Sequence, residues 1–237
     1  MKFFQLLALL VFLHPFALGQ SLPNDSTKRM QACTTCHGAG VTATVGRTAN
    51  EVYFPRIAGK PAGYLHNQLK NFRDGRRHYG LMVGLVEHLN DAALLEMAQY
   101  FALLDLPYPE PQAAPSSTSS TAMQRGQQLA LNGDASKGIA ACVSCHGANL
   151  LGVQPAIPGL LGLPRDYLAG QVGAWHTGMR RAQSPDCMAS VASRLSPDDV
   201  SAVSTWLAAQ RVPALAKPAA SLAALPAPLP VACGGVN

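Results

Sequence analysis

Two short motifs carry cysteine and histidine at a spacing that suits one kind of chemistry. They are Cys33-Thr34-Thr35-Cys36-His37 and Cys142-Val143-Ser144-Cys145-His146. At this spacing two thiols can bond to the vinyl groups of one haem while the adjoining histidine reaches the iron. A thioredoxin-like redox pair or half of a zinc site does not explain why histidine follows in both copies. The motifs therefore predict two covalently attached haem c groups, held by Cys33, Cys36, Cys142 and Cys145.

The sequence around the two motifs is repeated as well. Nine positions match between residues 54–75 and 157–178 at one offset of 103 (157 − 54). Beyond these matches the offset becomes 106, which aligns Met82 with Met188. So many matches in one register indicate a duplicated domain, with one haem motif in each copy.

The repeat also indicates which residues bind the irons. His37 and His146 are the expected ligands on one side, and a haem that transfers electrons needs a second axial ligand. Met82 and Met188 occupy equivalent positions, in stretches that the sequence predicts to be loops. A methionine thioether raises the reduction potential relative to a second histidine. Surface or supporting roles are expected for the histidines that do not recur at equivalent places, which are His66, His78, His88 and His176.

Cys187 and Cys233 lie outside the haem motifs. In an oxidising compartment two remaining thiols usually pair, and this bond would fasten the carboxy-terminal tail to the second domain. Two alternatives stay open: both thiols are free, or Cys187, which adjoins Met188, binds the iron as a thiolate.

Hydrophobic periodicity and capping residues predict an all-α protein. Each copy should have one helix at the haem motif, one after a proline loop and one after the methionine. Asn90 and Ser196 are the expected caps of the two final helices. The predicted divisions are a signal peptide (1–19), a first domain (20–106), an exposed Pro/Ser-rich linker (107–121), a second domain (122–211) and an extended Pro/Ala-rich tail (212–237).

The first residues are typical of a secretion signal. Lys2 precedes an apolar run over residues 3–13, and small residues precede a predicted cleavage site before Gln20. The run is too short to span a bilayer comfortably, and an uncleaved anchor is the alternative. The mature protein is therefore expected to be soluble in a bacterial periplasm.

Composition and charge argue against nucleic acid as a partner. Hydrophobic residues make up 48% of the chain and charged residues 13%, as in a packed soluble protein. The propionates of two haems would offset most of the formal charge of +5, and no run of Lys/Arg is interleaved with aromatic residues. Arg76-Arg77 and Arg180-Arg181 are either partners of haem propionates or solvated surface charges.

Haem motif, proline loop, tyrosine-containing helix, methionine and final helix occur twice in the same order. With these features the sequence resembles the dihaem cytochrome c4 family of class I cytochromes c over residues 31–210. The resemblance is most specific in Pro55-Arg56-Ile57-Ala58-Gly59 and in residues 64–77. It implies two tandem class I cytochrome c domains that pack face to face with their haems close together. It also implies that one iron is bound by His37 and Met82, and the other by His146 and Met188.

Such a protein is expected to carry one electron per haem from a quinol-oxidising complex or dehydrogenase to a terminal oxidase or reductase. Peripheral docking to membrane complexes is expected, without a small-molecule substrate or catalytic residues. The alternatives need one iron that is open or bound by Cys187: a dihaem peroxidase or sulfur-compound oxidoreductase, or a gas-binding sensor. Pro55 and Pro158 are expected to pack against the motif histidines and fix their rings.

Overall fold

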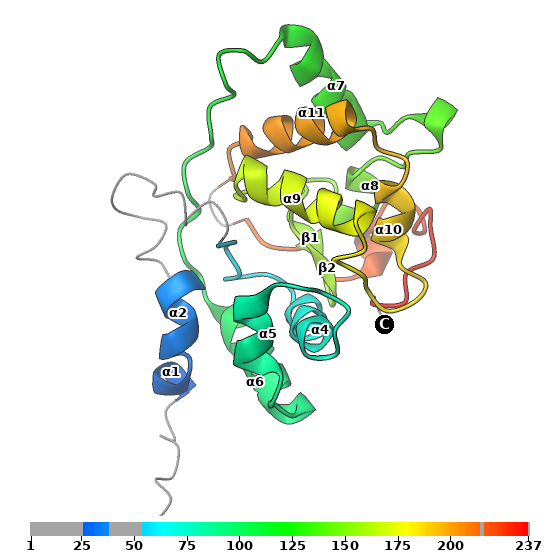
Figure 1. Ribbon diagram of the computed structural model, residues 1–237. Helices are drawn as coiled ribbons and strands as arrows, with labels where there is room; N and C mark the ends of the chain where they lie inside the picture. Colours follow the sequence, from blue (N-terminus) through cyan, green and yellow to red (C-terminus); the bar gives the residue numbers. More distant parts are fainter. Residues whose placement is uncertain (1–25, 38–53, 214–215, 237) are drawn as a thin grey trace, which may run out of the picture.

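The computed structural model describes residues 26–37, 54–213 and 216–236, so the predicted signal peptide and the loop after the first haem motif lie outside the described residues. Helices dominate the described residues, as predicted (Figure 1). The first copy forms α1 (Ser26–Arg29), α2 (Gln31–His37), α4 (Ala62–Arg73), α5 (Gly80–Val86) and α6 (Asp91–Leu103). The second forms α7 (Ser120–Leu131), the 3-10 helix η2 (Ala135–Lys137), α8 (Val143–His146), α9 (Arg165–His176), α10 (Cys187–Ala192) and α11 (Pro197–Ala208).

Three short elements complete the second copy and the tail. The strands β1 (Gly152–Val153) and β2 (Ile157–Pro158) pair antiparallel between α8 and α9. The tail contains a single turn of 3-10 helix, η3 (Leu222–Ala224), and is otherwise extended or turned where the structure describes it.

In the first copy α4 packs against α6. Leu65 of α4 and Phe101 of α6 belong to one buried cluster, and Phe72 and Leu94 belong to the next. These residues recur at helical spacing, so each helix presents one apolar face to the other. Asn90 caps α6 as predicted, because its side chain accepts a hydrogen bond from a main-chain N–H of the first turn.

In the second copy α7 crosses α11 at very short range. A Cβ atom at Gly126 would lie 2.3 Å from the carbonyl oxygen of Ala202, so a larger residue would push the helices apart. α11 begins with the predicted cap: Ser196 and Asp199 each accept a hydrogen bond from the other's main chain, and Pro197 is the first helical residue.

Equivalent segments of the two copies pair with each other. The backbone of Arg77 forms an antiparallel bridge with that of Arg180. Next to it, the amide of His78 donates to the carbonyl oxygen of Met179 at 2.8 Å. The two copies therefore meet face to face, each through the segment that follows its proline-loop helix.

The segment that was predicted to be an exposed linker packs against both copies. Arg56 donates to the carbonyl oxygen of Pro107 at 3.0 Å and lies over the ring of Tyr108. The amide of Gln112 donates to the carbonyl oxygen of Ala208 in α11 at 2.8 Å. α7 also begins inside the predicted linker range. Proline and serine predict little regular structure here, but main-chain carbonyls and a tyrosine ring still allow the segment to pack.

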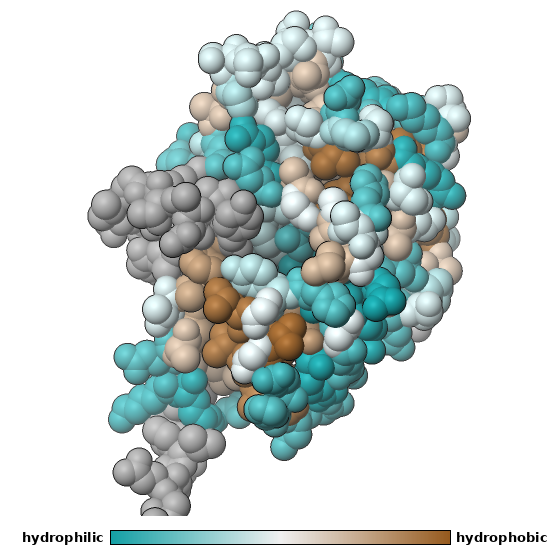
Figure 2. Space-filling view, in the orientation of Figure 1, coloured by the Kyte–Doolittle hydropathy of each residue, from teal (hydrophilic) through white to brown (hydrophobic). Residues whose placement is uncertain are grey.

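Apolar side chains lie at the surface over α5, where Figure 2 shows brown spheres. They include Leu81 and Leu85, whose exposed fractions are 64% and 57%. Across the described parts of the chain, none of the helices combines the length and the apolar character needed to cross a bilayer.

Candidate haem sites

Both motif histidines are held in the same way. Nδ1 of His37 lies 2.9 Å from the carbonyl oxygen of Pro55, and Nδ1 of His146 lies 2.7 Å from that of Pro158. A carbonyl oxygen only accepts hydrogen bonds, so each Nδ1 carries a proton and Nε2 keeps its lone pair. Burial lowers the pKa of both histidines, which favours the neutral imidazole that binds a metal. The contact expected of the two prolines is thus made by their carbonyl oxygens.

None of the four motif cysteines forms a disulfide. Burial raises the pKa of Cys33, and it raises that of Cys142 to about 11. Redox-active and zinc-binding cysteines need a lowered pKa, because the thiolate is the reactive form. Within the described residues no group of three or more His, Cys, Asp or Glu side chains gathers as a metal site would require. These thiols do not suit a thioredoxin-like pair or a zinc site.

The second copy brings its predicted iron ligands to one cavity. His146 from α8 and Met188 from α10 both line it, as does Cys145 of the haem motif. Most of the other lining side chains from this copy are apolar and come from β2, α9, α10 and the segment between β2 and α9; they include Ile157, Leu160, Leu163, Leu168, Val172 and Val191. An imidazole, a thioether, an adjoining thiol and an apolar wall fit a covalently bound haem.

Only part of the expected haem site of the first copy lies within the described residues. Met82 is half-buried against Phe72, Val86 and Leu94. The loop between His37 and the proline segment lies outside the described residues. The pairing of His37 with Met82 stays a prediction, supported by the repeat.

The sequence predicted that Met82 and Met188 lie in loops, and this prediction is wrong. Met82 belongs to the helix α5, and Met188 is the second residue of the helix α10. Two glycines disfavour helix in the first stretch, but the buried side chain of Val86 holds α5 against the core. In the second, Asp186 caps α10 by accepting a hydrogen bond from the amide of Ala189.

Arg77 and Arg180 lie where the two copies meet, and Arg180 is only 6% exposed. Burial lowers the pKa of Arg180, and the nearby charge of Arg77 adds to this effect. Their side chains donate to Gln68 and Gln171, and among the described residues neither forms a salt bridge with Asp or Glu. A buried guanidinium needs an anionic partner, so this pair fits carboxylates such as haem propionates. The prediction of a solvated surface charge is wrong for Arg180.

Lys60 is a residue of the site that sequence analysis did not single out. This lysine of the first copy lines the cavity of the second, and its Nζ donates to the carbonyl oxygen of Gly159 at 2.8 Å. Burial lowers the pKa of Lys60 to about 7, helped by the charge of Arg56. The equivalent residue of the second copy is Leu163, so comparison of the two copies could not single Lys60 out.

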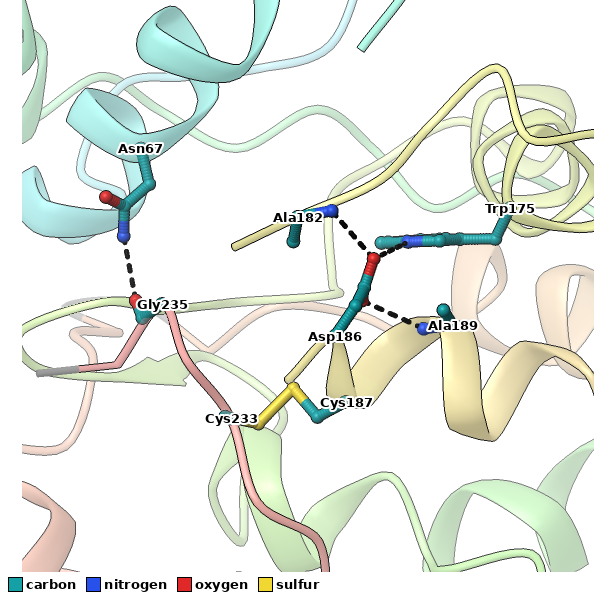
Figure 3. The surroundings of a disulfide bond; sticks show 8 residues. All are labelled: Asn67, Trp175, Ala182, Asp186, Cys187, Ala189, Cys233 and Gly235. Carbon is teal, nitrogen blue, oxygen red and sulfur yellow. Dashed lines mark hydrogen bonds between the residues drawn. A yellow bond between two sulfur atoms is a disulfide. The ribbon is translucent and has the colours of Figure 1, made fainter. Parts of the chain in front are cut away.

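Three of the competing ligands are bonded elsewhere or exposed. Cys187 forms the predicted disulfide with Cys233, which removes it as a thiolate ligand (Figure 3). Nε2 of His176 lies 2.5 Å from the carbonyl oxygen of Ala192, to which it donates. The side chain of His88 is 89% exposed beside Glu87. The Cys-ligated iron that the enzyme alternative invoked therefore has no support.

No protein-family model matches the chain. A curated relative, the thiosulfate dehydrogenase electron acceptor of Thiomonas intermedia, is 38% identical over 179 residues, which are 76% of this chain and 78% of the relative. Its name describes an electron carrier rather than an enzyme.

Two solved structures are similar. Reduced cytochrome c4 from Pseudomonas stutzeri has a TM-score of 0.63 at 25% identity. The match covers 78% of this chain and 96% of the other. Thiosulfate dehydrogenase (TsdBA) from Marichromatium purpuratum has a TM-score of 0.64 at 32% identity. That match covers 78% of this chain but spans only 37% of the other.

Proposed function

The chain belongs to the dihaem cytochrome c4-like family of electron-transfer proteins, and we propose that it accepts electrons from a periplasmic dehydrogenase such as a thiosulfate dehydrogenase. Its cofactor is covalently attached haem c, and its two tandem class I cytochrome c domains are the fold of this family. The observation that carries the proposal is the match to a relative named for this role at 38% identity. The match to part of a longer thiosulfate dehydrogenase chain supports the same kind of donor.

In this proposal one iron is bound by His37 and Met82, and the other by His146 and Met188. The shared cavity of His146 and Met188 supports the second pair, and the equivalent proline contact of His37 supports the first. The haem supplies the one-electron chemistry when bound. The protein holds the imidazoles in one tautomer, provides the thioethers and excludes water with apolar side chains.

The proposed divisions of the chain remain a signal peptide over 1–19, domains over 20–106 and 122–211, a connecting segment over 107–121 and a tail over 212–237. Transfer to the periplasm would follow from the signal peptide. The bond between Cys187 and Cys233 supports an oxidising compartment, because disulfides persist there and are rare in the cytosol. A terminal oxidase or reductase is the proposed acceptor, reached by docking at the membrane surface.

The donor is tested by mixing the oxidised protein with a purified thiosulfate dehydrogenase and thiosulfate. The absorption of reduced haem c reports electron uptake, and two electrons per protein molecule are expected. Omission of either the dehydrogenase or thiosulfate should abolish the reduction. A quinol-oxidising complex with its quinol provides the comparison. Rapid reduction by that complex and none by the dehydrogenase would show that the proposed donor is wrong.

A further inference from the structure

Residues 216–236, which we call the C-terminal strap, fold back over the second copy. Ala219 forms a parallel bridge with Val153 of β1. Farther along, Cys233 is bonded to Cys187, the first residue of α10 (Figure 3). Strap residues 231, 233, 235 and 236 line the same cavity as Met188. The end of the strap therefore lies at the proposed haem site.

α10 depends on its attachments. It has six residues, and Ala192 is its one buried residue. A helix this short does not hold itself in water. Asp186 ties its first turn to α9 by accepting hydrogen bonds from Nε1 of Trp175 at 3.1 Å and from the amide of Ala189 at 3.0 Å (Figure 3). The disulfide of Cys187 is the covalent attachment at this end, one residue from Met188.

The equivalent helix of the first copy is held differently. Val86 of α5 is 2% exposed and packs with Phe72 and Leu94, and Met82 contacts the same cluster. Met188 belongs to none of the hydrophobic clusters that the described residues form. Each of the two helices buries one residue at the equivalent position, Val86 in α5 and Ala192 in α10. Only Met82 packs against a hydrophobic cluster, so the position of Met188 depends more on the cap and on the strap.

The strap also contacts the place where the second copy is longer. The alignment offset rises by three between residue 178 and Met188, so the loop before α10 has three extra residues. The amide of Gly234 donates to the carbonyl oxygen of Pro185 in this loop at 2.9 Å. A Cβ atom at Gly234 would lie 2.1 Å from the carbonyl oxygen of Ser184, so glycine is required for this contact. The two departures of the second copy, a longer loop and a tail, pack against each other.

The strap reaches the first copy as well. Nδ2 of Asn67, on α4, donates to the carbonyl oxygen of Gly235 at 2.7 Å (Figure 3). Asn67 lines the cavity of the second copy together with Gly235. This hydrogen bond ties the end of the strap to the domain that faces the site.

We propose that the C-terminal strap, through the bond between Cys233 and Cys187, positions Met188 as a ligand of the second iron. The inference rests on the proposed function, because it takes Met188 to be that ligand. Cys233 is then a positioning residue: it acts on the iron only through α10. The first iron, whose Met82 is held by packing, does not depend on the strap.

The test compares the wild-type holoprotein with the double variant Cys187→Ser/Cys233→Ser. Both cysteines are replaced because a free Cys187 thiol could itself bind the iron. The readouts are the haem-to-protein ratio, the weak far-red band of methionine-ligated ferric haem, and carbon monoxide binding by the reduced protein. We expect an unchanged haem ratio, loss of about half of the far-red band and carbon monoxide binding at one haem of the two.

The first haem is the internal control. Reduction of the wild-type disulfide by a phosphine provides a second route that does not require the variant to fold. It should reproduce the spectral change, and the same phosphine should leave the double variant unaffected. A full far-red band without carbon monoxide binding after disulfide loss would overturn the role of the strap alone. A wild-type protein with only one methionine-ligated haem would remove the ligand assignment, and the strap's role with it.

Discussion

Arg180 of the second copy donates from Nη2 to Oε1 of Gln68 in the first at 3.1 Å, and Arg77 of the first donates in return to Gln171 of the second at 2.6 Å. The four residues are two equivalent pairs under the offset of 103. Each copy contributes one arginine and one glutamine, so the exchange joins the domains symmetrically. It also gathers two positive charges where the copies meet.

Replacement of Arg77 by glutamine should lower the reduction potential of the first haem. Burial lowers the pKa of His37, and the charge of Arg77 adds to that effect, so this guanidinium acts electrostatically on the proposed ligand. A nearby positive charge disfavours ferric iron, and its loss should lower the potential by roughly 50 mV at an effective dielectric constant of about 20. Spectroelectrochemical titration measures both haems. The variant Arg165→Gln is the control, because Arg165 forms an ion pair with the exposed Asp166.

Replacement of Lys60 by glutamine should lower the potential of the second haem instead. Burial lowers the pKa of His146, and the charge of Lys60 from the other domain adds to this effect. Below pH 7, where Lys60 with its lowered pKa is charged, a decrease of a few tens of millivolts is expected from the same electrostatic reasoning. The first haem of the variant should keep its potential. A change confined to the first haem would contradict the placement of Lys60 beside the second.

Replacement of Pro55 by alanine should raise the potential of the first haem. The Pro55 carbonyl oxygen accepts from Nδ1 of His37, which makes the imidazole a stronger electron donor to a metal. Alanine keeps the carbonyl but frees the backbone, so the hydrogen bond weakens. Complete loss of a bond worth about 0.5–1.5 kcal/mol in the ferric state alone would correspond to a rise of roughly 20–60 mV, which is the upper bound for a weakened bond. If redox titration finds the potential unaltered, the proline does not fix the ring.

Asp199 should make the second domain sensitive to acid. Burial alone would raise the pKa of this carboxyl, but hydrogen bonds from Arg125, Lys137 and Ser196 hold it well below its usual range. A carboxyl with a lowered pKa in the folded state stabilises the protein above its unfolded pKa, and this stability is lost as the pH falls towards the folded value. The free energy of unfolding should therefore decrease progressively below about pH 5.

The variant Asp199→Asn should lose about 2–3 kcal/mol of the free energy of unfolding at neutral pH and respond less to acid. Denaturant titrations at several pH values measure both effects. Asp166→Asn provides the control, because the Asp166 side chain is 53% exposed in its ion pair with Arg165 and should contribute little. Equal acid sensitivity of the wild type and Asp199→Asn would contradict this role.

Local sequence patterns predicted much of the fold. The caps at Asn90 and Ser196 are confirmed. They could be predicted because a side-chain oxygen must satisfy the first free amides of a helix. The disulfide between Cys187 and Cys233 is confirmed as well. It could be predicted because only these two cysteines lie outside the haem motifs. Both conclusions need only neighbouring residues or a count.

Features that depend on how the copies meet could not be predicted in this way. The repeat aligned Gln68 with Gln171, but an alignment of the copies does not predict that each glutamine accepts a hydrogen bond from the arginine of the other copy. Lys60 has no charged equivalent in the second copy, so the repeat did not predict that its side chain contacts the cavity of that copy. The helix around Met188 was missed because part of its support comes from residues farther away in the sequence, Cys233 and Trp175.

The most direct test of a dihaem electron carrier is the optical spectrum of the mature protein, taken oxidised, reduced, and reduced with carbon monoxide, together with its haem-to-protein ratio. Two haems per chain, a far-red band for two methionine-ligated irons and no change with carbon monoxide are predicted. A single haem per chain, or a haem that binds carbon monoxide in the wild-type protein, would contradict closed coordination by Met82 and Met188.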